Sequence, residues 1–582
     1  MDAVTGRKAP TFGELFTPKL ITVLKEGYGG KQLRQDAISG LTVAIVALPL
    51  SMAIAIASGV SPDRGLFTAI VGGFLVSVLG GSRFQIGGPA GAFIVLVAAT
   101  VAQHGVEGLV VATMMSGFFM LVIGYLRLGT YIKYIPYPVT VGFTAGIGVI
   151  IFASQLKELL GLTVAKEPGE LVPKIIALSD AIGTVNASAV TISLLTITLI
   201  VAVRMLRPTW PAMLIGVAAA TAVAAAFSLP VETIGTRFGG IPRTLPMPSL
   251  PELNWHKVSA VLPAALSFAL LGTIESLLSA VVADGMTGRR HRSNCELVGQ
   301  GFANIASALF GGICVTGTIA RTATNVRSGA YSPISGMLHA GFLLLFMLIA
   351  APLAGYIPLS ALAGVLAVVS YNMVEREAVV ALLRSSWGDA LVLLATLALV
   401  IFRDLSEGIV VGFLLGSILF IHRMAHNVGL EQERPLAAED VADADNEAPR
   451  PYDAYADPDT AVYRLSGAFF FGAATTVGSA LDMIAEHRRN IVLDFGAVPF
   501  LDSSAAKMIE GVVHKASKAK GKVYVTAASA AVRNMLAAHG VKSPHAHFAR
   551  SIDDAKAALK GEGARASRAT LTDPNNTASA GI

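Results

Sequence analysis

The chain has 582 residues, of which 53% are hydrophobic and only 14% are charged. Soluble proteins carry about 25% charged residues, so this composition excludes an ordinary soluble protein and predicts a polytopic α-helical membrane protein. The net charge of +5 gives no reason to expect a nucleic-acid partner, because many basic residues lie in short segments between apolar runs, where they set membrane topology.

Residues 1–35 are polar, of mixed charge and without a cleavable signal peptide, so we expect a cytoplasmic N-terminal segment. Apolar runs that are long enough to cross a bilayer then recur, and they predict a transmembrane domain over residues 36–427. Hydropathy predicts about fourteen spans in this domain. They start near residues 38, 65, 84, 108, 134, 187, 211, 258, 296, 317, 333, 358, 387 and 405.

Short basic loops recur on one side of the predicted spans, at Arg127, at Arg204 and over residues 289–292. Positive charge marks the cytoplasmic side of a membrane protein. With an even number of spans, both termini are therefore expected in the cytoplasm of a protein of the cell's inner (plasma) membrane. The longer loops over residues 157–186 and 229–257 are expected outside.

Two apolar stretches are interrupted near their starts, at Gly87–Phe93 and at Thr316–Thr322. Neither is long enough to span a bilayer as a full helix, which needs about 20 residues. Short or broken helices at corresponding places in two halves of a chain are the sequence signature of a transporter's binding site. Seven spans in each half make the second half inverted, so the layout predicts an inverted repeat.

The N-terminus of a helix presents free N–H groups and the positive end of the helix dipole, and two facing N-termini would hold an anion. Arg321 lies in the second stretch, where it would contact the anion or add positive field. Two alternatives remain open: close packing of helices through small residues, and a structural arginine in a salt bridge to Glu275. The other predicted substrate-binding residues are Gly88, Ala90, Gly91, Gly317, Thr318 and Ala320.

Glu275 lies in the middle of a predicted span and shares a helical face with Ser279. We expect this pair to bind the coupling cation, H⁺ or Na⁺, and we predict no other cofactor and no metal site. Ser51 and Ala55 belong to a stripe of small residues that either lines the substrate cavity or serves close packing. Asn325 is expected to face a loop.

An acidic linker is predicted over residues 428–460, followed by a small α/β domain over 461–560 and a disordered tail over 561–582. Strands are expected at 462–465, 490–495 and 522–526, and helices at 475–488, 503–519 and 530–539. Ser503 and Ser504 begin one of these helices. They are expected to cap it, with phosphorylation of a serine at this corner as the regulatory alternative.

Several of these stretches resemble the SulP (sulfate permease) family of anion transporters. The first span reads ALPLSMAIAIASG, and the two broken stretches read GGSRFQIGGPAGAF and GTIARTATNVRSGA. The span between residues 296 and 312 reads ELVGQGFANIASALFGG. The C-terminal motifs FFFGAA and LDSSAA are similar to those of the STAS domain of that family. The likeness extends from about residue 30 to about residue 560.

The resemblance implies a fourteen-helix inverted repeat, in which a core of spans 1–4 and 8–11 moves against a gate of spans 5–7 and 12–14. It also implies a homodimer and an anion site between spans 3 and 10. The expected function is cation-coupled transport of a small oxyanion, sulfate first, with bicarbonate and C4-dicarboxylate as alternatives and an anion channel as the alternative class. Many family members have Gln where this chain has Leu50. The sequence carries no nucleophile–base arrangement, so an enzyme is not expected.

Overall fold

The structure is a computed structural model. It describes residues 11–164, 168, 170–207, 210–403, 405–426, 429–432, 460–470, 481, 490–518 and 521–559. The chain divides into two compact units, Met1–Gly416 and Ser417–Ile582.

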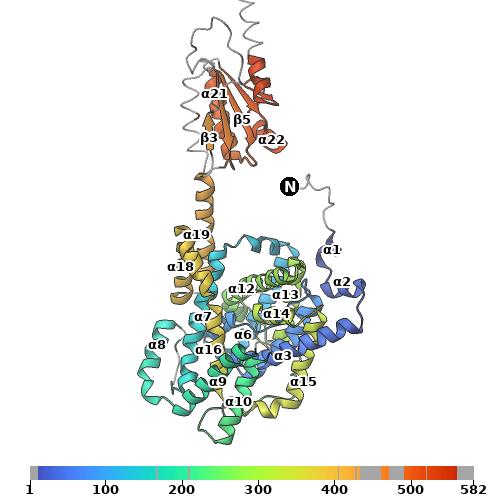
Figure 1. Ribbon diagram of the computed structural model, residues 1–582, viewed down its shortest axis with the longest axis vertical. Helices are drawn as coiled ribbons and strands as arrows, with labels where there is room; N and C mark the ends of the chain where they lie inside the picture. The colour runs from blue at the N-terminus through green and yellow to red at the C-terminus, as the bar shows by residue number, and fades with distance from the viewer. Residues whose placement is uncertain are drawn as a thin grey trace, which may run out of the picture. The chain divides into compact units, whose positions relative to one another are not determined.

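The first half of the membrane unit contains helices at the predicted span positions (Figure 1). Its elements are α1 (Phe12–Phe16), α2 (Lys19–Glu26), α3 (Gly30–Ala57), α4 (Pro62–Phe67), a π-helical turn (Thr68–Gly72), α5 (Gly73–Leu79), β1 (Gly87–Gly88), a 3₁₀ turn (Gly91–Phe93), α6 (Ile94–Tyr125), a 3₁₀ segment (Leu128–Tyr134), α7 (Tyr137–Leu160), α8 (Leu171–Asp180), a 3₁₀ turn (Ile182–Thr184), α9 (Ala187–Leu206), α10 (Ala212–Ala226) and α11 (Ile234–Phe238).

The second half repeats the pattern of long helices around one short, interrupted helix. Its elements are α12 (Trp255–Thr287), α13 (Ser293–Leu309), β2 (Thr316–Gly317), α14 (Ile319–Arg327), α15 (Ile334–Ala354), α16 (Leu359–Met373), α17 (Arg376–Ser385), α18 (Trp387–Phe402) and α19 (Leu405–His426).

The helices confirm a polytopic membrane protein. In the part of the chain that is described, eight helical stretches are long and apolar enough to cross a bilayer, and α10 and α18 are shorter apolar helices. Two predicted spans share α6, which bends at Gly105, where φ is +67°. Glycine adopts this left-handed conformation without steric cost, so the sharp bend falls there.

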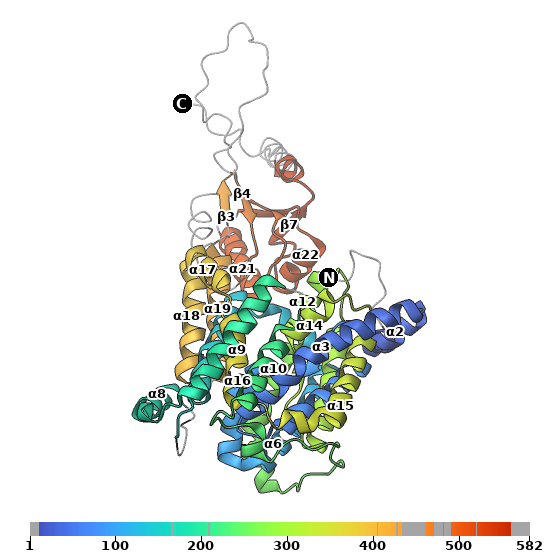
Figure 2. The same cartoon turned by 60° about the horizontal axis from the view of Figure 1, so that its bottom comes forward.

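The helices pack in two groups (Figures 1 and 2). In one group, α6 packs against α12 and α13, and α3 packs against α15; in the other, α7 packs against α16 and α18, and α9 against α10. The contact between α6 and α13 depends on two glycines. A Cβ at Gly117 would lie 2.6 Å from the carbonyl oxygen of Gly301, and a Cβ at Gly301 would lie 2.7 Å from that of Gly117. These groups correspond to the core and gate expected from the sequence.

A buried carboxylate fastens the start of α3 to the turn between α14 and α15. Asp36 is fully buried and accepts hydrogen bonds from the backbone N–H of Tyr331 at 2.7 Å and of Ser332 at 3.0 Å. It also accepts from the hydroxyls of Ser332 and Tyr28. All four donors lose their partner if the carboxylate is removed.

We therefore expect Asp36→Ala to destabilise the membrane unit by about 3 kcal/mol, because buried donors left without an acceptor cost about 1–3 kcal/mol each. The measurement is thermal unfolding in detergent. Asp180→Ala is the control, because Asp180 is an exposed aspartate at the end of α8. Equal midpoints for the two variants would contradict the role given to Asp36.

The second unit contains a five-stranded sheet in the order β3-β4-β5-β6-β7. The strand β3 (Gly429–Gln432) is antiparallel to β4 (Thr460–Ser466), whereas β5 (Asn490–Ala497), β6 (Lys522–Thr526) and β7 (Ala546–Ala549) continue in parallel. Two helices, α21 (Ser503–Lys518) and α22 (Ala530–Ala538), lie where the sequence predicts them. The sequence did not predict β3 or β7.

Three predictions for the C-terminal region fall largely or wholly outside the described residues. They are the helix over 475–488, most of the linker over 428–460 and the tail over 561–582. The expectation that serines cap α21 is wrong, because the carboxylate of Asp502 accepts the N–H of Ala505 at 2.8 Å. Ser503 and Ser504 are exposed in the first turn, and their phosphorylation stays a prediction.

Candidate functional site

The two interrupted stretches meet in the membrane unit. β1 and β2 form an antiparallel ribbon, in which Gly87 is opposite Gly317 and Gly88 is opposite Thr316. Directly after the ribbon, one chain enters the 3₁₀ turn that leads into α6 and the other enters α14. The N-termini of the two half-helices are therefore brought together, as the sequence predicts.

Two of the predicted binding residues have a packing role instead. A Cβ at Gly88 would lie 2.1 Å from Nη1 of Arg321, and a Cβ at Gly317 would lie 1.6 Å from Nε2 of Gln85. Real Cβ atoms do not approach other atoms so closely, so a larger residue at either position would displace the side chain that covers the ribbon. Neither Gly88 nor Gly317 lines the cavity in front of it.

A cavity of about 270 Å³, the central cavity, opens in front of the two helix starts. The predicted residues that line it are Ala90, Gly91, Glu275, Thr318, Ala320 and Arg321. Polar side chains that the sequence did not single out line it too: Thr140 and Thr144 of α7, Arg204 of α9, Asn372 of α16, and Glu375 at the N-cap of α17. Core and gate helices thus contribute to the same cavity.

The first turn of α14 leaves its backbone donors free. No side chain in the described part of the chain caps this helix. The N–H of Thr318 donates to the carbonyl oxygen of Ile86 at 3.0 Å. The first backbone hydrogen bond of the helix itself runs from the N–H of Thr322 to the carbonyl oxygen of Thr318. Ala320, which lies between them, is exposed to the cavity. The free N–H groups and the helix dipole make this wall of the cavity positive.

The 3₁₀ turn before α6 forms the facing wall and has no side-chain cap either. The N–H of Phe93 donates to the carbonyl oxygen of Ala90 at 3.1 Å. Gly91 lines the cavity, and a Cβ there would lie 3.3 Å from Cδ1 of Ile151 on α7, so this turn also faces the gate.

Arg321 is 1% exposed, yet it lines the central cavity. One guanidinium nitrogen, Nη2, donates to the hydroxyl of Ser51 and to the carbonyl oxygen of Pro89, both at 3.2 Å. Its Nε and Nη1 have no hydrogen-bond partner among the described residues. Donors of a buried cation are rarely left unused, so this side chain retains capacity for an anionic ligand.

Glu275 of α12 faces the same cavity, and its Oε2 is buried with no hydrogen-bond partner in the described part of the chain. No ion pair within 4.0 Å joins it to Arg321, so the alternative of a static salt bridge is not what the structure shows. A buried carboxylate without a partner is costly unless it is neutralised by a proton or a metal cation. Its position therefore suits a site that exchanges a cation during function.

Ser279 does not join Glu275 at the cavity, which corrects the expectation that the two form one cation site. Its hydroxyl donates to Oγ1 of Thr322 at 3.0 Å, so it fastens α12 to α14. One turn earlier, the hydroxyl of Ser276 accepts the N–H of Gly317 at 3.1 Å. These contacts hold the ribbon and α14 on α12, so both serines support the site from behind.

Ser51 and Ala55 do not line the central cavity either, although the helix they belong to does. Leu50 and Ile54 face the cavity instead. A Cβ at Gly65 of α4 would lie 2.1 Å from the carbonyl oxygen of Ser51 and 3.0 Å from Cβ of Ala55. The stripe of small residues therefore serves the close packing of α3 on α4, and Ser51 also accepts from Arg321.

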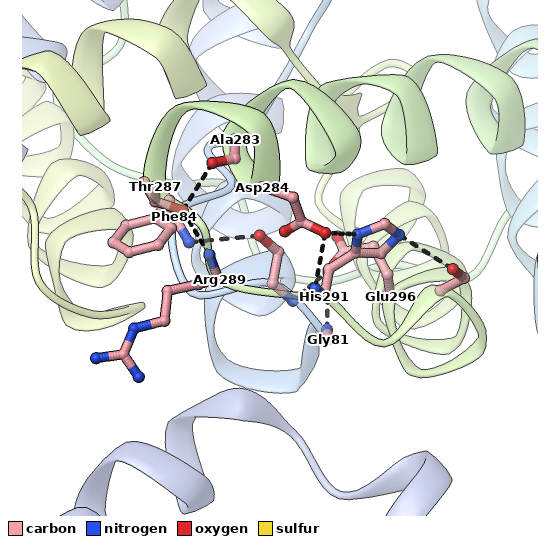
Figure 3. A network of polar contacts seen from close by, with 10 residues as sticks. Gly81, Phe84, Ala283, Asp284, Thr287, Arg289, His291 and Glu296 are labelled. Carbon is pink, nitrogen blue, oxygen red and sulfur yellow. Dashed lines mark hydrogen bonds and ion pairs between the residues drawn. The ribbon is translucent and has the colours of Figure 1, made fainter. Parts of the chain in front are cut away.

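Polar side chains that lie away from the cavity tie the core helices together. Asn325 was expected to face a loop, but it is fully buried and donates to the carbonyl oxygen of Phe84 at 2.9 Å. In the last turn of α12, Asp284 accepts the backbone N–H of His291 at 3.0 Å and contacts its ring at 2.7 Å (Figure 3). Glu296 accepts from Gly81 at 2.8 Å. Among the described residues, no group of three or more His, Cys, Asp or Glu is placed to hold a metal ion.

Comparison with known proteins gives two family matches. The model of the sulfate permease family matches residues 33–396, and the model of the STAS domain matches residues 452–555. "Putative sulfate transporter YvdB" of Bacillus subtilis is 38% identical over 515 residues, which cover 88% of this chain and 94% of that protein. "Bicarbonate transporter BicA" of a Picosynechococcus strain is 30% identical over 526 residues, which cover 87% and 90%.

Among solved structures, the murine Slc26a9 anion transporter in its inward-facing state has a TM-score of 0.82 to this chain, with 96% of this chain and 97% of that chain covered. The sequence identity is 17%, so the likeness concerns the fold. The fold is that of a polytopic helical transporter with a C-terminal parallel α/β domain.

Proposed function

The chain belongs to the sulfate permease family, a family of anion transporters and not of enzymes, and we propose that it is a secondary active transporter that carries a small oxyanion by alternating access. Sulfate is the first candidate substrate. The relative with 38% identity carries a sulfate transporter's name, and a dianion suits a site with two helix N-termini and an arginine.

The observation that carries this proposal is the composition of the central cavity. Uncapped amides at two helix starts and the unused donors of Arg321 face a space of about 270 Å³. No described cation within 4.0 Å neutralises Glu275, and no described acid within 4.0 Å neutralises Arg321. A small anion bound beside Arg321 would use the arginine and the amides together.

Glu275 gives the transporter its coupling site in this proposal. When the anion binds, a proton or a sodium ion on Glu275 offsets the added negative charge, so that the loaded core can move against the gate. Without the cation, the anion and the carboxylate repel one another inside the same cavity. That repulsion makes binding of the two solutes interdependent, which is the requirement for symport.

Bicarbonate is the second candidate substrate, with a C4-dicarboxylate third. The observation in favour of bicarbonate is the relative BicA, 30% identical over most of both chains, whose name gives that substrate. Leu50 and Ile54 make one side of the cavity apolar, which suits a singly charged anion with less hydration to replace.

The test is uptake of radiolabelled sulfate and of radiolabelled bicarbonate by proteoliposomes that contain the full-length protein, with imposed proton and sodium gradients. We expect saturable uptake of one of the anions that depends on one of the gradients. Flux that does not saturate and ignores both gradients would identify an anion channel on the same scaffold. Failure to move either anion would reject both substrates.

Three further features belong to the proposal. The basic loops support an orientation with both termini in the cytoplasm of a plasma-membrane protein. The proposed partners are the anionic substrate, the lipid bilayer and a second copy of the chain in a homodimer. The domain boundaries predicted from the sequence, including a STAS domain over 461–560, are also part of this proposal.

A further inference from the structure

A second and larger space, the distal cavity, lies farther along the helices that line the central cavity. Its volume is about 660 Å³. Along α7, Ile147 is the last residue that lines the central cavity and Ile150 is the first that lines the distal cavity. Along α16, Leu366 lines the distal cavity and Val369 lines the central cavity. Each step of three residues corresponds to roughly 4.5 Å of helix.

The barrier between the two cavities is therefore about one helical turn thick and apolar where α7 and α16 cross it. Ile147 is fully buried, and Leu366 is 1% exposed. Side chains of this kind separate the two cavities along α7 and α16. The distal cavity thus lies on the other side of this barrier, along helices that the two cavities share.

A buried amide in the distal cavity lacks a partner. Gln155 of α7 lines this cavity, is 4% exposed, and makes no side-chain hydrogen bond among the described residues. The amide is not among the fully buried polar atoms that lack a partner, so it opens onto the space of the cavity, where a ligand or water can complete its bonding. Its amide NH₂ can donate two hydrogen bonds to an oxyanion.

A cation without an ion pair lies two residues further on. Lys157 lines the same cavity, is half-buried, and its ammonium has no partner in the described part of the chain. The other cations at this cavity are engaged: Arg237 pairs with Glu158 at 2.5 Å, and Arg403 pairs with Glu407 at 3.4 Å.

The remaining charges at the distal cavity leave a positive balance. Lys174 lines it from α8 and is 9% exposed, and it has an interaction of its own. The acidic residues among its described lining are Glu158, which is paired, and Glu170, which is exposed. The described lining contains four basic side chains and two acidic ones, so the cavity attracts anions over cations.

We propose that the distal cavity contains a second anion-binding subsite for a small oxyanion, with the Gln155 amide as its ligand and the Lys157 ammonium as a source of positive charge at the same cavity. The anion waits there until the barrier opens, or leaves by this route after release. This inference rests on the proposed function in one respect, namely that the anion of the subsite is the anion that is transported.

The subsite can be tested without measuring transport. Ser154→Cys places a thiol in the distal cavity next to Gln155, in full-length protein whose buried Cys295 and Cys314 are replaced by alanine. Modification by a small cationic, membrane-impermeant thiol reagent is followed with sulfate or bicarbonate added from either side. We expect one of these anions, added with the reagent on one side only, to slow modification.

In the same background, Gln155→Leu and Lys157→Gln should each raise the protecting concentration of that anion at least tenfold. Gln103→Leu is the matched control, because Gln103 lines the same cavity but is exposed, and it should leave protection unchanged. Lys157→Gln keeps a half-buried polar chain, so it remains informative if Gln155→Leu does not fold. Failure of both anions to protect the thiol would overturn the subsite.

Transport adds a second readout, with uptake measured separately from each side of the vesicle. Lys157→Gln should raise KM at least tenfold for anion presented on the distal side and leave KM from the other side unchanged. An equal rise from both sides would also overturn the subsite. Protection of the thiol in protein that transports neither anion would uphold the subsite and reject the transport proposal.

Discussion

Ala320→Glu is expected to lower the affinity for the transported anion at least a hundredfold. Ala320 lies in the first turn of α14, is exposed to the central cavity and adjoins the free backbone donors of that turn. A carboxylate placed there would occupy the positive end of the helix itself. Two like charges about 4 Å apart repel by about 4 kcal/mol at an effective dielectric constant near 20, and each 1.4 kcal/mol is a factor of ten.

The control for this variant is Ala320→Gln, which adds a side chain of the same size without charge. Binding of radiolabelled sulfate or bicarbonate to purified protein measures the effect directly. The glutamine variant should lose far less affinity than the glutamate variant, because only the latter brings the repulsive charge. Equal losses would show that the cavity is merely filled, and unchanged affinity in both variants would place the anion site elsewhere.

Glu275→Gln is expected to abolish accumulation of the anion against its gradient, while the protein stays folded and still binds the anion. Oε2 of Glu275 has no hydrogen-bond partner among the described residues, so an amide of the same shape breaks no hydrogen bond of this atom. The amide cannot be charged, and it therefore cannot carry a proton or attract sodium. Removal of a negative charge from the anion's cavity should also tighten anion binding.

Glu375→Gln serves as the control, because Glu375 lines the same cavity from the N-cap of α17 but is exposed. Uptake by proteoliposomes under an imposed gradient should stop at the equilibrium level for Glu275→Gln and exceed that level for Glu375→Gln. Full concentrative uptake by Glu275→Gln would remove the coupling role from this carboxylate. Loss of uptake by both variants would show that transport depends on the total charge of the cavity and not on Glu275 in particular.

Much of the fold could be predicted because it depends on features that one stretch of chain carries. An apolar run of sufficient length must be a span, and glycines before a short run leave a half-helix. The predicted spans near 187, 387 and 405 coincide with the starts of α9, α18 and α19. β7 has only four residues and was missed, because so short a strand depends on its neighbour β6 and carries little pattern of its own.

Only the part of the site that lies at the starts of the broken helices could be predicted from the sequence. Ala90, Thr318 and Arg321 lie at the helix starts, so their positions follow from the interruption itself. Arg204 and Asn372 come from gate helices far away in the sequence, and no local pattern links them to the cavity. Only the packing of the helix groups brings them there.

The sequence left the rotation of α3 open. Ser51 and Ala55 were expected either to line the cavity or to serve close packing, and the structure shows the packing, with Leu50 and Ile54 at the cavity. The two sets differ by one residue, which is a rotation of about 100° around the helix axis. A helix that is apolar all round shows no preferred face in its sequence, so its rotation is decided by the contacts of its neighbours.

In the proposed transporter, the thin barrier between the two cavities is the place where the membrane voltage would act on a transported charge. If water fills both cavities, most of the electrical potential falls across the one turn of α7 and α16 that separates them. An elementary charge that crosses this turn gains or loses about 2.3 kcal/mol for each 100 mV. The number of cations that travel with each anion sets the net charge that crosses the barrier in the proposed cycle. That net charge therefore decides how strongly the turnover rate depends on the membrane voltage.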